Sequence, residues 1–350
     1  MRCLIAAGGT AGHVLPALAV AEALTQRGVH VTFAGSPDRV EARLVPEAGY
    51  ELDTFRISGF PRRPSVELVR ALLLAGAAPR ACRRILQARR PHVVLGGGGF
   101  VAGPMVFAAS TMRIPTALTE ADAHLGLANR LAAPFARRIF LAYPIATRHR
   151  AKTRIVGRPI PARSQPVPQD EARASFELPR EGPVLGAFGA LAGAKTLNEL
   201  VVDTWGESGP PILHVTGRRD FETVRARVRR EDYVALPETE RFGAALAATD
   251  LVLGRAGGTV WEIAAAGKPA ILVPYPFATG DHQASNAQHF VQAGGAIMVR
   301  ELDLDDVPGL VRSLLDDQAR LQRMGDAMLG AARPNAAGEI ADELIVLAGR

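Results

Sequence analysis

Short β-branched runs alternate with helical stretches along the chain. Strands buried on both faces of a parallel sheet appear as short apolar runs, whereas amphipathic helices repeat apolar positions every three or four residues. Such runs lie in the first half of the chain at residues 3–7, 30–34, 92–95, 115–118 and 138–141. In the second half they lie at residues 183–188, 212–215, 250–253, 270–273 and 296–299. The alternation predicts an α/β fold with parallel sheets wrapped by helices.

A proline-rich segment separates the two halves. Residues 157–161 read GRPIP, and residues 165–168 read QPVP. Proline removes a backbone donor and interrupts both helix and sheet, so this segment is interpreted as a linker. The sequence therefore predicts two domains, residues 1–157 and 158–350, and the last helix is expected to pack back on the first domain.

The two halves repeat a strand, a glycine turn and a helix start. Residues 4–13 read LIAAGGTAGH, and residues 185–194 read LGAFGALAGA. Turns of this kind direct backbone N–H groups at a phosphate, although glycines also serve for tight turns and close packing. Neither turn has the spacing of a dinucleotide or Walker loop, so neither NAD nor ATP is favoured. His13 in the first copy corresponds to Ala194 in the second, so only the first turn offers a side chain for chemistry.

His13 lies where a predicted strand gives way to a helix, at the sheet edge where α/β proteins bind ligands. An imidazole at this place can accept a proton from an attacking hydroxyl or stabilise a developing charge. The alternative is a capping or packing histidine.

Further glycine clusters follow predicted strands. Residues 96–104 read GGGGFVAGP, and four consecutive glycines indicate either a close backbone approach or a hinge. Residues 254–262 read GRAGGTVWE, in which Glu262 could accept hydrogen bonds from a ribose diol or simply interact with the helix dipole.

Gln283 and Asn286 share a helix face and could jointly bind a sugar, although such amides more often face solvent.

Composition and charge narrow the classes of function. Of 350 residues, 48% are hydrophobic and 22% charged, which excludes wholesale disorder. The net charge of +6 suggests an anionic partner: nucleic acid, a phosphate ligand or a membrane surface. Aromatic residues make up only 5% and no nucleic-acid motif is present, so a nucleic-acid partner is not expected.

Metal binding, secretion and membrane spanning are not predicted. Two cysteines, Cys3 and Cys82, cannot form a metal cage and do not indicate an oxidising compartment. The Asp303-Leu304-Asp305 sequence precedes a predicted helix at residues 307–315 and is interpreted as a helix cap, not as a metal site. The first residues predict a strand and not a signal peptide, and no run reaches 18 apolar residues. A cytoplasmic location is expected.

In their order along the chain, these motifs resemble those of the MurG family of peptidoglycan glycosyltransferases. The matching segments are residues 8–16, 96–104, 214–218, 255–267 and 281–287, and the resemblance extends over nearly the whole chain. It implies a glycosyltransferase B-type fold, in which two Rossmann-like domains face each other across a cleft. It also implies an inverting transfer of N-acetylglucosamine from UDP-N-acetylglucosamine to the muramyl C4 hydroxyl of undecaprenyl-pyrophosphoryl-N-acetylmuramyl-pentapeptide (lipid I), without a metal ion or cofactor.

The resemblance implies a role for individual residues. His13 would lie beside the reacting centre, Glu262 would hold the ribose, and Gln283 would hold the N-acetylglucosamine hydroxyls. Asp122 stands where the family has an asparagine that contacts the sugar. The other implied donor-binding residues are Thr10, Ala11, Gly12, Gly189, Gly257, Gly258, Thr259, Val260 and Asn286.

Several positions depart from the family pattern. Residues 119–122 read TEAD where the family usually has His-Glu-Gln-Asn, Leu191 replaces a serine, and Pro161 stands where an arginine is expected. Two other functions therefore remain open: a related UDP-sugar transferase with another lipid or small-molecule acceptor, and a degenerate binding subunit without catalysis.

A short apolar stretch at residues 66–74 follows two arginines, Arg62 and Arg63. Pro79 is expected to interrupt it, before a second helical segment with arginines on one face and Cys82, Ile85 and Leu86 on the other. We interpret the stretch as a surface that docks on anionic lipid, or alternatively as a leucine helix buried under a loop. The former predicts a peripheral enzyme on the inner face of the cell membrane. The implied membrane-contacting residues are Arg70, Leu72, Leu73 and Arg80.

Overall fold

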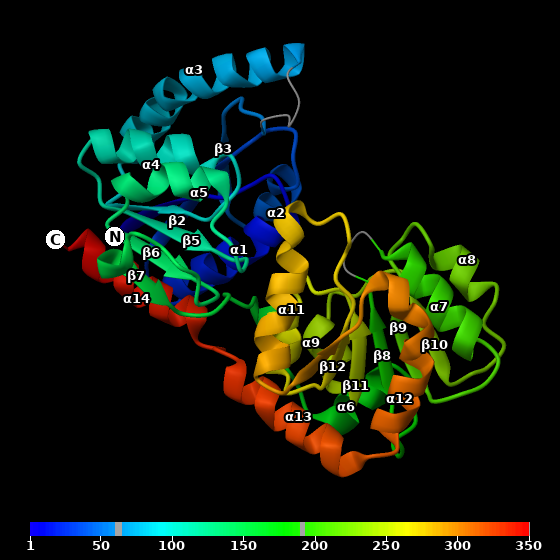
Figure 1. Ribbon diagram of the computed structural model, residues 1–350. Coiled ribbons are helices and arrows are strands. Elements are labelled where there is room, and N and C mark those ends of the chain that lie inside the picture. Colours follow the sequence, from blue (N-terminus) through cyan, green and yellow to red (C-terminus); the bar gives the residue numbers. More distant parts are fainter. Residues whose placement is uncertain (60–64, 190–192, 350) are drawn as a thin grey trace. The chain divides into compact units, whose positions relative to one another are not determined.

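The computed structural model describes residues 1–59, 65–189 and 193–349, and Figure 1 shows its helices and strands. Within the described chain the fold consists of two compact units, each built around its own parallel sheet. The first unit comprises Met1–Pro161 and Pro334–Arg350, and the second comprises Ala162–Arg333.

The first unit contains a seven-stranded parallel sheet in the order β3-β2-β1-β4-β5-β6-β7. The strand order reverses between β1 and β4, and such a reversal places the ends of the two central strands beside a crevice. The strands are β1 (Arg2–Ala6), β2 (His30–Gly35), β3 (Glu51–Thr54), β4 (Val93–Gly96), β5 (Thr116–Glu120), β6 (Arg138–Leu141) and β7 (Thr153–Ile155).

Helices cover both faces of this sheet (Figure 1). Successive strand residues point to opposite faces, so Cys3 and Ile5 pack with α1, α2 and α14, whereas Leu4 and Ala6 pack with α3 and α4. The helices are α1 (Ala11–Thr25), α2 (Glu41–Glu47), α3 (Val66–Arg89), α4 (Ala102–Thr111), α5 (Leu127–Ala132), α14 (Ala336–Ala348) and the short 3-10 turns η1 (Ala133–Phe135) and η2 (Arg150–Lys152).

The second unit contains a six-stranded parallel sheet in the order β10-β9-β8-β11-β12-β13. Its strands are β8 (Leu185–Phe188), β9 (Ile212–Val215), β10 (Tyr233–Leu236), β11 (Leu251–Gly254), β12 (Ala270–Leu272) and β13 (Ala296–Met298). Its helices are α6 (Gln169–Ser175), α7 (Lys195–Trp205), α8 (Phe221–Arg225), α9 (Phe242–Ala247), α10 (Val260–Ala265), α11 (His282–Gln292), α12 (Val307–Leu315) and α13 (Gln318–Ala331), with 3-10 turns η3 (Ala162–Ser164), η4 (Thr279–Asp281) and η5 (Glu301–Asp306).

The predicted fold class, two Rossmann-like parallel-sheet units, is confirmed, and all ten predicted strands are present. The sequence missed β3, β7 and β10, which lie at sheet edges, where one side of the strand is unpaired. β3 and β7 consist mainly of polar residues, whereas β10 (YVAL) is a partly buried apolar run that was not predicted as a strand. The structure divides the chain after Pro161 instead of after residue 157, and α14 belongs to the first unit. Asp303 and Asp305 lie in η5, directly before α12.

The predicted break at Pro79 is wrong, because α3 continues through it from Val66 to Arg89. Proline has no N–H to donate to the carbonyl of Ala75, and the helix tolerates the loss of this one hydrogen bond. The second half of α3 has the predicted two faces. Cys82 and Leu86 are buried against the sheet, while the outward face exposes Arg80, Arg83 and Arg84.

Candidate functional site

Two glycine turns lie side by side in the first unit, one after β1 and the other after β4. In the second turn, Gly98 and Gly99 have φ of 101° and 75°, a region that favours glycine. A Cβ atom on Gly98 would lie 2.6 Å from the His13 ring, and one on Gly99 would lie 2.0 Å from the Gly8 carbonyl oxygen. The four-glycine run is therefore a place of close backbone approach, and what it approaches is His13.

A buried carboxylate, that of Glu41, accepts hydrogen bonds from the turn after β1. Glu41, at the start of α2, is fully buried and accepts hydrogen bonds from the Gly9 N–H and the Ser36 N–H, each at 2.9 Å. A Cβ atom on Gly8 would lie 2.3 Å from a Glu41 carboxylate oxygen, so the turn and the carboxylate fit only with glycine there. Sequence reasoning missed Glu41, whose only signal is an acidic residue shortly after the second strand.

His13 is the third residue of α1 and is half-buried between these turns. Its Nδ1 atom lies 3.2 Å from the Thr10 hydroxyl oxygen. Burial lowers the pKa of His13, and the charge of Arg158 lowers it further, while the carboxylates of Asp122 and Glu120 raise it in part. The net effect is a neutral imidazole at pH 7, the form that can accept a proton.

The loop after β5 places Asp122 close to His13. Glu120 is buried at the end of β5, where its two carboxylate oxygens accept backbone N–H groups of Ala121 at 3.0 Å and Gly126 at 2.8 Å. The Asn129 amide donates a further bond to Glu120 at 3.0 Å. Glu120 thus holds the loop from inside, and Asp122 is left partly exposed within electrostatic range of His13.

In the second unit, the glycine turn after β11 leads into α10. Gln283 of α11 lies against this turn, because a Cβ atom on Gly257 would lie 3.9 Å from the Gln283 amide nitrogen. The Gln283 amide oxygen accepts a hydrogen bond from the Tyr275 N–H at 2.9 Å. The amide nitrogen is the group through which Gln283 can donate a hydrogen bond. The turn continues through Gly258, Thr259 and Val260, of which Val260 is buried.

Glu262 and Asn286 differ in exposure. Glu262, on α10, is half-buried, and one of its carboxylate oxygens accepts the Ser164 hydroxyl at 2.5 Å. Asn286, on α11, is fully buried, and its amide donates to the Ala256 carbonyl at 3.3 Å. Asn286 therefore supports the turn from inside the protein, and its implied contact with the sugar stays a prediction.

Arg255 has a structural role in the same turn. Its buried guanidinium pairs with Glu301 at 2.5 Å and donates to the Thr196 hydroxyl at 2.9 Å. These bonds connect the end of β11 to η5 and α7.

Gly189 follows β8, in tight contact with the Ala194 backbone. Leu191 lies outside the described residues. Within the described ranges, no cluster of three His, Cys, Asp or Glu side chains is arranged to hold a metal ion.

His214, in the 214–218 motif, belongs to a buried network beneath the second unit's glycine turns. Its Nε2 lies 3.0 Å from the Asn198 amide oxygen, and its Nδ1 lies 2.7 Å from the Tyr233 hydroxyl. An amide oxygen only accepts hydrogen bonds, so Nε2 bears the proton and Nδ1 accepts from Tyr233. Burial lowers the pKa of His214 to about 3, so the histidine stays neutral in the folded protein.

We expect His214 to make folding sensitive to acid. Between an unfolded pKa near 6.5 and a folded pKa of about 3, the unfolded state binds one more proton. The free energy of unfolding should therefore fall by about 1.4 kcal/mol for each pH unit below 6.5. Urea denaturation at pH 7 and pH 4.5 should show a smaller fall in His214→Gln, which keeps an amide donor and acceptor but does not titrate. An equal fall in wild type and variant would contradict this.

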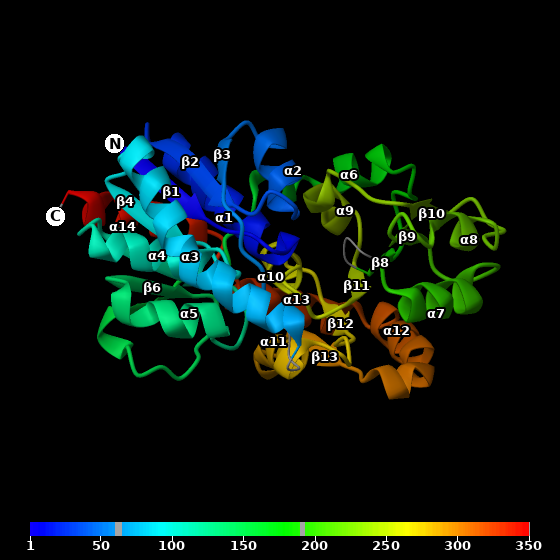
Figure 2. The same ribbon diagram turned by 90° about the horizontal axis from the view of Figure 1, so that it is seen from above.

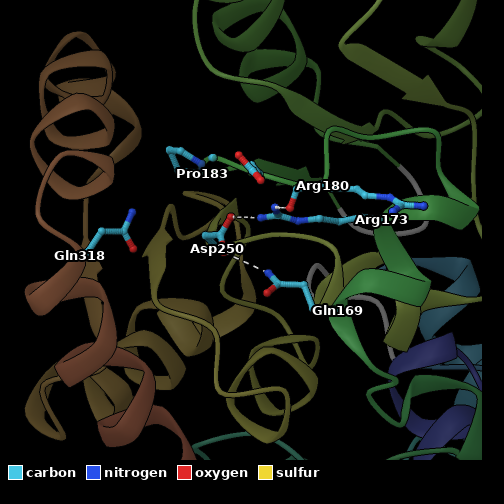
Figure 3. A pocket seen from close by; sticks show the side chains of 8 residues that line it. Gln169, Arg173, Arg180, Pro183, Asp250 and Gln318 are labelled. Carbon is cyan, nitrogen blue, oxygen red and sulfur yellow. Dashed lines mark hydrogen bonds and ion pairs between the residues drawn. The ribbon is translucent and has the colours of Figure 1, made fainter.

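The second unit also contains a small polar cavity of about 280 Å³ (Figure 3). At its centre Asp250 accepts hydrogen bonds from Arg173 at 2.6 Å and from Gln169 at 3.0 Å. Pro183 lies two residues before β8 and Asp250 directly before β11, so the cavity lies at the sheet edge opposite the glycine turns. Its central charges already pair with each other, which is the arrangement of a structural network and not of an open site.

Comparisons with known proteins agree with this geometry. Residues 3–141 match the glycosyltransferase family 28 N-terminal domain, and residues 189–340 match the family 28 C-terminal domain. The chain is 43% identical to the UDP-N-acetylglucosamine–N-acetylmuramyl-(pentapeptide) pyrophosphoryl-undecaprenol N-acetylglucosamine transferase of Acidithiobacillus ferrooxidans, over 99% of this chain and 98% of the relative. It is 37% identical to the protein of the same name in Halothermothrix orenii, over 95% of each chain.

Solved structures give the same result. The crystal structure of Acinetobacter baumannii MurG superposes with a TM-score of 0.79 at 27% identity, covering 99% of each chain. The calicheamicin glycosyltransferase CalG4 superposes with a TM-score of 0.71 at 20% identity, covering 100% of this chain and 98% of that one, and so shares the fold. The resemblance to the MurG family is thus confirmed, and the chain belongs to glycosyltransferase family 28.

Proposed function

We propose that this chain transfers N-acetylglucosamine from UDP-N-acetylglucosamine to the muramyl C4 hydroxyl of undecaprenyl-pyrophosphoryl-N-acetylmuramyl-pentapeptide, with inversion at the anomeric carbon. The observation that best supports the proposal is the neutral imidazole of His13, held between two glycine turns at the carboxyl ends of β1 and β4. Its relatives from Acidithiobacillus ferrooxidans and Halothermothrix orenii are named for this reaction.

In the proposed reaction, His13 acts as a general base. The acceptor hydroxyl oxygen bonds to the anomeric carbon as its proton passes to the imidazole, and the bond from that carbon to the UDP oxygen breaks with its electron pair on UDP. The carboxylates of Asp122 and Glu120 then stabilise the imidazolium, since both favour its charged form.

The second unit supplies residues suited to the donor. Glu262 would accept hydrogen bonds from the ribose diol, and the amide nitrogen of Gln283 would donate to a sugar hydroxyl. Backbone N–H groups of the turn at Gly257 and Gly258 would stabilise the charge that develops on the departing diphosphate. A direct test is UDP release from UDP-N-acetylglucosamine, which should require a lipid I analogue. Release at the same rate without an acceptor would contradict the transferase proposal.

We further propose that α3 holds the protein at the inner face of an anionic membrane. The first half of this helix exposes three large apolar side chains: Val66 at 81%, Val69 at 58% and Leu73 at 72%. Figure 2 shows α3 along α4, whose Phe107 is also partly exposed. No helix in the described part of the chain is both long and apolar enough to cross a membrane.

Arginines on the outward face of α3 suit this surface to anionic lipid. Arg80, Arg83 and Arg84 are exposed, and each cation near an anionic surface contributes about 1 kcal/mol. The predicted membrane contacts of Arg70 and Leu72 lie outside the described side chains, as do Arg62 and Arg63.

We expect the protein to sediment with anionic liposomes at low salt and to be released as salt rises, because these charges are screened over about 8–10 Å. Val69→Glu/Leu73→Glu should abolish sedimentation. Leu302→Glu is the matched control, since Leu302 is 97% exposed but lies in η5 of the second unit. The proposal would be contradicted if wild type stayed in the supernatant at low salt. It would also be contradicted if Leu302→Glu lost as much sedimentation as Val69→Glu/Leu73→Glu.

A further inference from the structure

Arg158 connects the two loops that present His13 and Asp122. It follows β7 in the first unit and is 7% exposed. One guanidinium nitrogen donates to the Gly12 carbonyl at 2.7 Å, and the other donates to the Ala121 carbonyl at 3.1 Å. Gly12 and Ala121 directly precede His13 and Asp122 in sequence. A single planar group therefore fixes the backbone immediately before both functional side chains.

The chemistry of this bridge is specific to arginine. A buried cation is costly unless hydrogen bonds and opposite charge compensate it, and here two carbonyls accept its protons. The carboxylates of Asp122 and Glu120 act on His13 together with Arg158, so all three charges influence the same imidazole. Lysine would keep the charge, but its compact ammonium lacks the rigid fork that reaches two carbonyls at once.

We propose that Arg158 is a positioning residue that holds His13 and Asp122 in the relative geometry needed for acceptor activation. This inference rests on the proposed transferase function. The groups that act on His13 by charge or by hydrogen bonding are the Thr10 hydroxyl, the Gly8 backbone, Asp122, Glu120 and Arg158 itself. Pro161 stands where the family pattern has an arginine, and Arg158 is a buried guanidinium three residues before it.

The test is a comparison of Arg158→Lys with a matched variant, Arg173→Lys. Arg173 is 4% exposed and also bridges backbone carbonyls, those of Ala248 and Arg180, but it lies at the opposite sheet edge in the second unit. Arg158→Lys should lower kcat about 10–100-fold, because a displacement near 1 Å costs up to about 10²-fold in rate. The KM for UDP-N-acetylglucosamine should rise by a smaller factor than kcat falls, since Glu262 and Gln283 in the second unit are untouched.

Chemical rescue by guanidinium ion distinguishes a positioning role of Arg158 from a role in packing alone. In Arg158→Ala, guanidinium ion at concentrations well below denaturing should restore part of kcat, while equal concentrations of sodium chloride or methylammonium should not. Equal kcat in Arg158→Lys and wild type would overturn the inference. The inference would also be overturned if Arg173→Lys and Arg158→Lys lowered both Tm and kcat by the same amounts. Failure of guanidinium to restore kcat in Arg158→Ala would overturn it as well. An inactive wild type would instead overturn the proposed function.

Discussion

His13→Ala should lower kcat by about 10²–10⁴-fold, the contribution of a positioned general base, while leaving the Kd for UDP nearly unchanged. The imidazole is neutral because burial lowers its pKa, and the charge of Asp122 favours the protonated form. Its contribution is therefore realised as the acceptor loses its proton, and not when the donor binds.

The measurement is kcat with saturating donor and acceptor, together with calorimetry of UDP binding. His30→Ala is the control, because His30 lies on β2 and its side chain is 60% exposed. A change in kcat of less than about threefold for His13→Ala would leave His13 as a capping residue. A similar loss for His30→Ala would point to general destabilisation.

Glu262→Ala should weaken UDP binding about 10–100-fold, because hydrogen bonds to a charged group contribute about 1.5–3 kcal/mol. The carboxylate is fixed by the Ser164 hydroxyl at 2.5 Å, so it is preorganised to accept bonds from the ribose. Ser164→Ala should have a smaller effect of the same sign, since it frees the carboxylate without removing it.

Gln283→Ala provides the contrast. An amide that reads a sugar hydroxyl rejects the epimer, so this variant should reduce discrimination between UDP-N-acetylglucosamine and UDP-N-acetylgalactosamine. Its affinity for UDP alone should remain close to that of wild type. Calorimetry of UDP binding, together with kcat/KM for both sugar donors, distinguishes the role of Glu262 from that of Gln283. Equal losses of UDP affinity in Glu262→Ala and Gln283→Ala would refute the assigned roles.

The central architecture was predictable from the chain because its signals are local. Buried parallel strands appear as apolar runs, and the glycine turns follow directly from them, so His13 and Glu262 could be placed at strand ends. The edge strands β3 and β7 were missed because they are short and mainly polar, whereas β10 was missed although its four residues are apolar. The break at Pro79 was wrong because tertiary packing of Cys82 and Leu86 outweighs one lost helical hydrogen bond.

The supporting residues of the site depend on contacts distant in sequence. Glu41 accepts the Gly9 N–H across 32 positions, and Arg158 reaches the Gly12 carbonyl across 146. No spacing or motif in a single sequence indicates such pairings, since each arises only when separate strands meet in one sheet. The spacing of Gln283 and Asn286 predicts one shared helix face, but only the packing shows that the Asn286 amide is buried and the Gln283 amide half-buried.

The central claim is that His13 activates the muramyl hydroxyl of a lipid-linked acceptor. The most direct measurement incubates wild type and His13→Ala with UDP-N-acetylglucosamine and a short-chain lipid I analogue, and identifies the product by mass spectrometry and NMR. We predict a β-1,4-linked disaccharide and one UDP per linkage with wild type, and a rate reduced at least about 10²-fold with His13→Ala. No disaccharide from wild type, an α linkage, or equal rates for the two proteins would contradict the account.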